Sequence, residues 1–156
     1  MTQIKLNVGD PLPEAELEVH PGPGTVKLSS YKGKWVVLYF YPRDDTPGCT
    51  KEACNFRDSI KEIRALGAEV VGVSTDSIRS HQKFTTKYGL NFPLLSDSEG
   101  VLGTKLGALR NGFFKSMRRV TFIIDPKGRI AKIYPQVDPG NHSEEVLRDL
   151  KTMIVS

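Results

Sequence analysis

Cysteine, histidine and long apolar runs are all scarce in this chain of 156 residues, which contains 2 Cys and 3 His. The longest apolar run, from Trp35 to Tyr41, is far shorter than the ~20 residues that cross a bilayer. The N-terminal residues lack both the apolar segment and the small-residue cleavage site of a secretory signal. We therefore expect a protein without a membrane partner, located in the cytoplasm.

Metal-binding and cofactor-binding patterns are also missing. The two cysteines stand in the segment Cys49-Thr-Lys-Glu-Ala-Cys54, without the second ligand pair that a structural zinc site needs. His20, His81 and His142 are scattered and form no His-x-x-x-His pair. No Gly-x-Gly-x-x-Gly follows an expected strand, and no flavin or haem motif is present. We expect no metal and no bound cofactor.

The composition that remains is that of an ordinary globular chain, with 38% hydrophobic and 26% charged residues. Length and composition predict a single domain over residues 1–156. The net charge is +4, and one dense basic cluster consists of Arg110, Lys115, Arg118 and Arg119. Because the basic residues are otherwise interleaved with Asp and Glu, a solvated surface is favoured over a polyanion site. We expect no nucleic-acid partner.

The order of apolar patterns predicts an α/β fold. The run 35–41 is apolar on both faces and rich in β-branched and aromatic residues, as is typical of a central buried strand. Further strands are expected at 25–28, 69–74, 120–124 and 129–134. Helices are expected at 49–66, from 77 or 80 to 88, at 98–106 and after Ser143, which should cap the last helix. This order predicts a mixed central β-sheet flanked by helices on both faces, a thioredoxin-like fold with an N-terminal extension.

The segment Tyr41-Pro-Arg-Asp-Asp-Thr-Pro-Gly-Cys-Thr50 carries the main chemical signal. It places Cys49 in the first turn of a helix, where unpaired N–H groups and the helix dipole stabilise a thiolate, the reactive form of cysteine. Thr46 offers a hydroxyl that can donate to an incoming oxygen or accept its proton, while Pro42 and Pro47 stiffen the loop and shield the sulfur. A free cysteine is most often a small buried hydrophobe, but a loop of this composition favours the reactive alternative.

This segment resembles the Pro-x-x-x-Thr-x-x-Cys motif of the peroxiredoxins. Its continuation to Asp58 is similar to the subgroup called bacterioferritin comigratory protein, or peroxiredoxin Q. The resemblance extends from about Val8 to Leu150 and includes the segments 72–76, 80–84, 88–97, 119–125 and 142–147. It implies a thioredoxin-like fold and a thiol-dependent peroxidase that reduces hydrogen peroxide and organic hydroperoxides.

The resemblance implies a role for each matching residue. Cys49 would attack the terminal peroxide oxygen and become a sulfenic acid. The peroxide oxygens would be held by Thr46, by Arg119 and by the backbone N–H group of Gly48. The N–H group of Cys49 would also hold these oxygens, and Glu52 would orient Arg119. Simpler interpretations stay open: Thr46 as a turn former, Glu52 as an acidic residue favourable in a first helical turn, and Arg119 as a surface charge.

Cys54 would be the resolving cysteine, which forms a disulfide with Cys49 that thioredoxin or a glutaredoxin-like protein reduces. In a continuous helix, Cα atoms five residues apart lie roughly 8.6 Å from each other, whereas a disulfide needs about 4.4–6.8 Å. We therefore expect the first turns of this helix to unwind during each cycle and to refold on reduction. If Cys54 is only a packed helix residue, another thiol must resolve the sulfenic acid.

Several alternatives stay open. Strand alternation puts Arg118 and Arg119 on opposite faces, and the motif favours Arg119 as the inward residue. Phe113, Phe114 and Met117 either form an apolar lip of the active site or belong to the core. The rival functions are a thioredoxin-like disulfide oxidoreductase, which normally uses Cys-x-x-Cys, and a redox-sensing or nucleic-acid-binding protein that uses the basic cluster. We expect a monomer.

Overall fold

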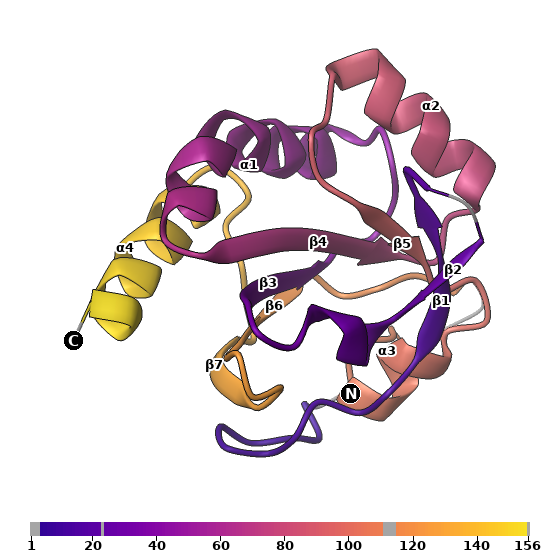
Figure 1. Ribbon diagram of the computed structural model, residues 1–156. Coiled ribbons are helices and arrows are strands. Elements are labelled where there is room, and N and C mark those ends of the chain that lie inside the picture. The colour runs from indigo at the N-terminus through magenta and orange to yellow at the C-terminus, as the bar shows by residue number, and fades with distance from the viewer. Residues whose placement is uncertain (1–3, 23, 111–114, 156) are drawn as a thin grey trace.

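The centre of the molecule is a seven-stranded mixed sheet, described by a computed structural model that covers residues 4–22, 24–110 and 115–155. The strand order is β2-β1-β5-β4-β3-β6-β7 (Figure 1). The strands are β1 (Glu16–His20), β2 (Thr25–Lys27), β3 (Trp35–Phe40), β4 (Ala68–Ser74), β5 (Leu94–Ser96), β6 (Val120–Ile124) and β7 (Ile130–Tyr134). The strand β3 lies inside the sheet, parallel to β4 and antiparallel to β6.

Side chains of β3 alternate between two hydrophobic cores, one on each face of the sheet. Val37 and Tyr39 belong to the first core, whereas Val36, Leu38 and Phe40 belong to the second. All five are at most 5% exposed. Burial on both faces explains why this strand is a continuous apolar run rather than an alternating one. The prediction of a central buried strand is confirmed.

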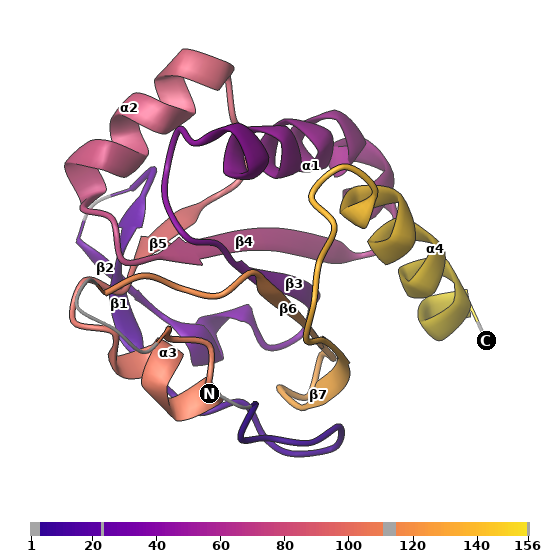
Figure 2. The same cartoon turned by 180° about the vertical axis from the view of Figure 1, so that it is seen from behind.

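Helices cover both faces of the sheet, as the views from front and behind show (Figure 1 and Figure 2). They are α1 (Pro47–Ala65), α2 (Ile78–Tyr88), α3 (Val101–Leu106) and α4 (His142–Val155), with a short 3-10 helix η1 (Leu28–Tyr31). The helices α1, α2 and α4 pack on the first core through Phe56, Phe84 and Val146. The helix α3 packs on the second core through Leu102, beside the N-terminal segment around Leu6. Within the described ranges, no helix combines the length and the apolar character needed to span a membrane.

Two details differ from the sequence prediction. The prediction lacks β1, because the sequence Glu-Leu-Glu-Val-His contains two glutamates, which have low strand preference. Pairing with β2 and β5 stabilises this strand instead. Ser143 does not cap α4, because the helix begins one residue earlier, and the Asn141 carbonyl already accepts from the Glu145 N–H group at 3.2 Å. Ser77, one of the two predicted caps of α2, accepts from the Ser80 N–H group at 3.1 Å.

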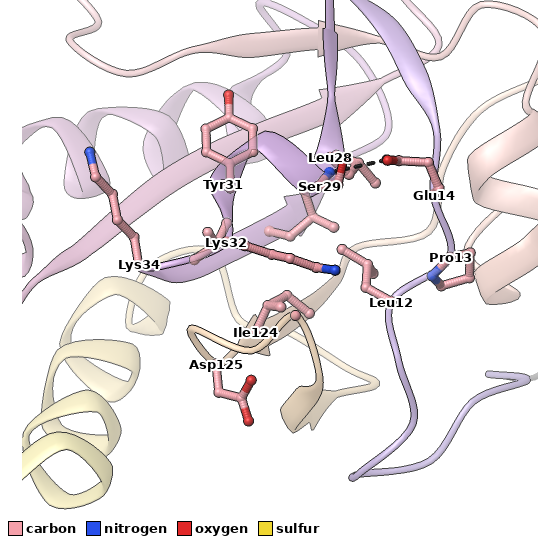
Figure 3. Close-up of a pocket in the computed structure, with 13 residues that line it drawn as sticks. Leu12, Pro13, Glu14, Leu28, Ser29, Tyr31, Lys32, Lys34, Ile124 and Asp125 are labelled. Atoms are coloured by element: carbon pink, nitrogen blue, oxygen red, sulfur yellow. Dashed lines mark hydrogen bonds between the residues drawn. The ribbon is translucent and has the colours of Figure 1, made fainter.

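A cavity of about 120 Å³ lies under the N-terminal segment (Figure 3). Its apolar wall includes Leu28 and Ile124, and the Glu14 carboxylate accepts a hydrogen bond from the Ser29 N–H group at 3.0 Å beside it. Leu28 and Ile124 belong to the second core, whereas Cys49 belongs to the first. The sheet therefore separates this cavity from Cys49.

Candidate active site

Cys49 is the third residue of α1 and is buried, with 1% of its surface exposed. The helix begins at Pro47, which has no N–H group, and the N–H groups of Gly48 and Cys49 have no carbonyl partner in a preceding turn. Thr46 is the N-cap residue, and its carbonyl accepts from the Thr50 N–H group at 2.8 Å. The sulfur therefore lies at the positive end of a 19-residue helix.

Arg119 joins this sulfur to a buried carboxyl group. Its Nη2 donates to Sγ of Cys49 at 3.4 Å, and its Nη1 donates to Oε1 of Glu52 at 2.7 Å. The side chain of Glu52 is fully buried, and that of Arg119 is 19% exposed. Arg118 instead donates to the Gly107 carbonyl at 3.5 Å, at the end of α3. The structure places Arg119 inward and Arg118 elsewhere, as strand alternation predicts.

Three smaller residues shape the surroundings of the sulfur. A Cβ atom at Gly48 would lie 3.0 Å from Nη2 of Arg119, so the missing side chain allows the guanidinium to approach the helix end. The Thr46 hydroxyl donates to the Arg43 carbonyl at 3.0 Å, which leaves its lone pairs as acceptors. Pro42 is half-buried two residues after the end of β3, where its ring fixes the backbone φ angle.

Three buried polar atoms near Arg119 have no hydrogen-bond partner among the described residues: Oε2 of Glu52, the hydroxyl of Tyr39 and Nδ1 of His142. Burial raises the pKa of Glu52 to about 7, although Arg119 acts to lower it. Burial and the nearby Glu52 carboxylate also raise the pKa of Tyr39 well above its ordinary value. At neutral pH the Glu52 carboxyl is therefore divided between its charged and neutral forms.

His142 is buried close to the same arginine. Its Nε2 lies 2.8 Å from Oγ1 of Thr121, and its ring packs edge-on against Phe56 and Tyr134. Burial, together with the positive charge of Arg119, lowers the pKa of His142 to about 4. The ring is therefore neutral at physiological pH and adds no charge to the site.

A Glu52→Gln variant is expected to change how the free energy of unfolding depends on pH. Because folding raises the pKa of Glu52 from 4.5 to about 7, this carboxyl stabilises the fold below pH 4.5, and the contribution is lost as the pH rises to 7. The pKa of His142 falls from 6.5 to about 4 on folding, so its contribution has the opposite sign and grows as the pH rises from 4 to 6.5. The contribution of His142 is the same in both proteins, so it cancels when the free energy of unfolding of the variant is subtracted from that of the wild type. The remaining difference should fall by about 3 kcal/mol between pH 4.5 and 7.

Urea unfolding at a series of pH values measures this difference. Glu62→Gln is the matched control, because it makes the same change at an exposed position of the same helix, and it should show no comparable fall. A difference for Glu52→Gln that stays constant with pH would contradict a buried, ionisable carboxyl at this position.

Cys54 is half-buried farther along α1, and both thiols are free. Arg57, one turn beyond it, interacts electrostatically with Cys54 and donates to the Tyr88 carbonyl at 2.6 Å. Cys49 and Cys54 lie in one uninterrupted helix, in which Cα atoms five residues apart are separated by roughly 8.6 Å. The helix therefore has to change shape before these two sulfurs can form a bond.

The basic cluster of the sequence does not form one patch. Arg119 faces the buried sulfur, whereas Lys115 lies 3.6 Å from the Glu99 carboxylate on the surface. Met117 is completely buried in the second core, which favours core packing over an active-site lip for this residue. Phe113 and Phe114 lie outside the described residues.

Sequence reasoning missed the polar surroundings of Arg119. Tyr39 and Thr121 are direct neighbours in the register of β3 and β6, and His142 reaches Thr121 from α4. Strand alternation could have placed Tyr39 on the same face as Val37, but only the strand pairing brings it beside Thr121. In the sequence, only the resemblance of segment 142–147 to the peroxiredoxins pointed to His142.

The chain is similar to known proteins over most of its length. The model of the AhpC/TSA family matches residues 8–133. Peroxiredoxin Bcp of Bacillus subtilis (strain 168) is 45% identical over 155 residues, which cover 96% of this chain and 98% of that protein. A solved mutant structure of Xylella fastidiosa PrxQ has 37% identity and a TM-score of 0.88, over 95% of this chain and 97% of that one. A structure of Xanthomonas campestris bacterioferritin comigratory protein, described in terms of its alkyl peroxide reduction activity, has 31% identity and a TM-score of 0.85, over 97% of this chain and 99% of that one.

The matches to these relatives extend along nearly the whole chain. The solved relatives share the mixed sheet flanked by helices, so the predicted thioredoxin-like fold is confirmed. The chain belongs to the AhpC/TSA family, within its Bcp and peroxiredoxin Q group, and is a thiol-dependent peroxidase.

Proposed function

We propose that Cys49 is the peroxidatic cysteine, because it combines a helix N-terminus with a hydrogen bond from Arg119. Its thiolate attacks the terminal oxygen of a hydroperoxide, so that an S–O bond forms while the O–O bond breaks. The hydroxyl group passes to the sulfur, which becomes a sulfenic acid. The leaving oxygen takes up a proton and departs as water or as an alcohol.

The surrounding groups hold the peroxide and bind the charge that develops on its leaving oxygen. Arg119 and the Gly48 N–H group are the donors. Thr46 accepts the hydrogen bond of the peroxide O–H group, because its own hydroxyl already donates to a backbone carbonyl. Glu52 keeps the guanidinium directed at the sulfur, and Pro42 forms part of the wall of the site.

Cys54 then resolves the sulfenic acid. Its thiolate attacks Sγ of Cys49, an S–S bond forms, and the hydroxyl group leaves as water after taking up a proton. The first turns of α1 unwind to permit this bond, because the helical distance is too long for it. A dithiol protein, thioredoxin or a glutaredoxin-like protein, reduces the disulfide and restores the helix.

Hydrogen peroxide and organic hydroperoxides are the proposed substrates. The alkyl peroxide reduction attributed to the Xanthomonas campestris relative supports the organic substrates. We further propose that the chain forms one domain over residues 1–156, acts as a monomer in the cytoplasm, and needs no metal, cofactor or nucleic acid.

A Cys54→Ser variant tests the resolving step. It should react with the first equivalent of peroxide as the wild type does and then accumulate a sulfenic acid on Cys49, which dimedone labels and mass spectrometry locates. NADPH oxidation in the presence of thioredoxin, its reductase and peroxide should fall by about tenfold or more, because no intramolecular disulfide is available. Wild-type turnover by this variant would show that another thiol resolves Cys49.

A further inference from the structure

The turn that joins β3 to α1 is attached to α2 by a buried carboxylate. Oδ2 of Asp44 lies 2.7 Å from Nδ1 of His81 and accepts from the Ser80 hydroxyl, also at 2.7 Å. Oδ1 of the same carboxylate accepts from the Tyr41 hydroxyl at 2.6 Å. His81 is completely buried, and its Nε2 lies 2.9 Å from the Leu95 carbonyl. Both oxygens of the carboxylate and both nitrogens of the ring are thus engaged.

The backbone at this position is held as well. The Asp44 N–H group donates to Oδ2 of Asp76 at 2.8 Å, and the same oxygen accepts from the Ser74 hydroxyl at 2.6 Å. The Ser96 hydroxyl donates to the Asp76 carbonyl at 2.6 Å. These contacts connect the turn to the ends of β4 and β5, which are among the most buried parts of the sheet.

The next residue is attached to the other end of α2. Oδ1 of Asp45 accepts from the Tyr88 hydroxyl at 2.7 Å, and Oδ2 accepts from Nζ of Lys87 at 2.8 Å. The backbone of Asp45 has a φ of +58°, in the left-handed region that aspartate tolerates better than most residues. We call these contacts of Asp44 and Asp45 with α2 the α2 clamp. Figure 2 shows the clamped turn running between α1 and α2.

The chain that follows makes fewer side-chain hydrogen bonds. Among the described residues, residues 46–54 make three side-chain hydrogen bonds: Thr46 donates to the Arg43 carbonyl, and Cys49 and Glu52 each accept from Arg119. In the proposed mechanism Arg119 also donates to the peroxide, so its contact with the sulfur changes during the reaction. Within the described ranges, side-chain hydrogen bonds to α2 and to the ends of β4 and β5 therefore stop at Asp45, and those of residues 46–54 involve only Arg43 and Arg119.

We infer that Asp44, His81 and Asp45 are positioning residues for Cys49, and that the α2 clamp stays closed in both redox states, so that unwinding of α1 begins at Thr46. This inference rests on the proposed Cys49–Cys54 disulfide. A fixed end keeps the unwound segment short, which limits the conformations over which the two sulfurs must find each other. It also preserves the turn that shapes the peroxide site, so that reduction returns the cysteine to the same place.

Amide hydrogen exchange in the reduced and disulfide forms of the wild type tests the boundary. The Asp44 amide, which donates to Asp76, should exchange at the same rate in both forms to within about twofold, whereas amides from Gly48 to Cys54 should exchange at least about tenfold faster in the disulfide form. Equal acceleration at Asp44 would overturn the inference. If mass spectrometry finds no Cys49–Cys54 disulfide after peroxide treatment, the proposed catalytic cycle is refuted. The inference that α1 unwinds from a clamped end is then refuted as well.

A Ser80→Ala variant separates positioning from general stability. Loss of one hydrogen bond to the Asp44 carboxylate should accelerate exchange of the Asp44 amide in the disulfide form by about tenfold, while amides in the interior of β3 keep their wild-type rates. Ser30→Ala is the matched control, because it removes a hydroxyl that donates to the Lys27 carbonyl at 2.6 Å on η1, and it should leave Asp44 unchanged. His81→Gln, which disturbs both ring contacts, should give a larger acceleration at the same amide. Wild-type exchange at Asp44 in both clamp variants, or the same acceleration in the control, would overturn the inference.

Discussion

A Cys49→Ser variant is expected to lose peroxidase turnover by at least about a thousandfold. A serine hydroxyl stays protonated at neutral pH and cannot replace the thiolate that attacks the O–O bond. The substitution leaves Arg119 and the N-terminal end of α1 unchanged. The groups that bind the developing charge are therefore still present, but the nucleophile is missing. The loss is measured as peroxide-dependent NADPH oxidation with thioredoxin and its reductase.

Cys54→Ser is the matched control, since it makes the same replacement five residues further along the same helix. It should still consume one equivalent of peroxide, whereas Cys49→Ser should consume none. The circular dichroism spectra of both variants should match that of the wild type, because sulfur and oxygen differ little in size at these positions. Peroxide consumption by Cys49→Ser at a rate near that of Cys54→Ser would exclude Cys49 as the nucleophile.

The part of this site that lies within one segment is predictable from sequence. A buried strand, a proline-rich turn and a helix start are local signals. Together they place Thr46 and Cys49 correctly at the N-terminal end of α1. Arg119 lies 70 positions away from Cys49 in the chain. Its inward direction was nevertheless predictable, because period-two alternation leaves only two choices and the family motif selects one.

The remaining part depends on which elements pair in space, and sequence patterns do not contain that information. Asp44 looks like a solvated loop residue until α2 places His81 against it. Tyr39 looks like an ordinary core aromatic until Glu52 is found buried near its hydroxyl. In both cases a polar group is buried by long-range packing, so no local hydrophobic pattern marks it. The strand β1 was missed because its two glutamates have low strand preference and the strand is stabilised by pairing with β2 and β5.

An Arg119→Met variant is expected to slow the reaction with peroxide by about a hundredfold to a thousandfold, the usual cost of removing one donor that binds transition-state charge. Stopped-flow tryptophan fluorescence or competition with a second peroxidase measures this rate. The fold should survive, because Glu52 without its partner can take up a proton and remain buried as a neutral acid. Arg119→Lys keeps the charge, but a single ammonium group cannot reach Cys49 and Glu52 with the geometry of a guanidinium. It should therefore recover only part of the rate.

A double-mutant cycle with Glu52→Gln shows whether the buried carboxyl acts through the arginine. Alone, Glu52→Gln should slow the reaction by about tenfold, because the guanidinium loses the contact at 2.7 Å that directs it. In the Arg119→Met background the same change should have almost no effect, since nothing remains to be directed. Additive effects would instead mean that Glu52 acts on the peroxide or the sulfur independently of Arg119. Non-additive effects would assign to Glu52 a single task, which is to hold one charged donor against the sulfur of Cys49 at the N-terminal end of α1.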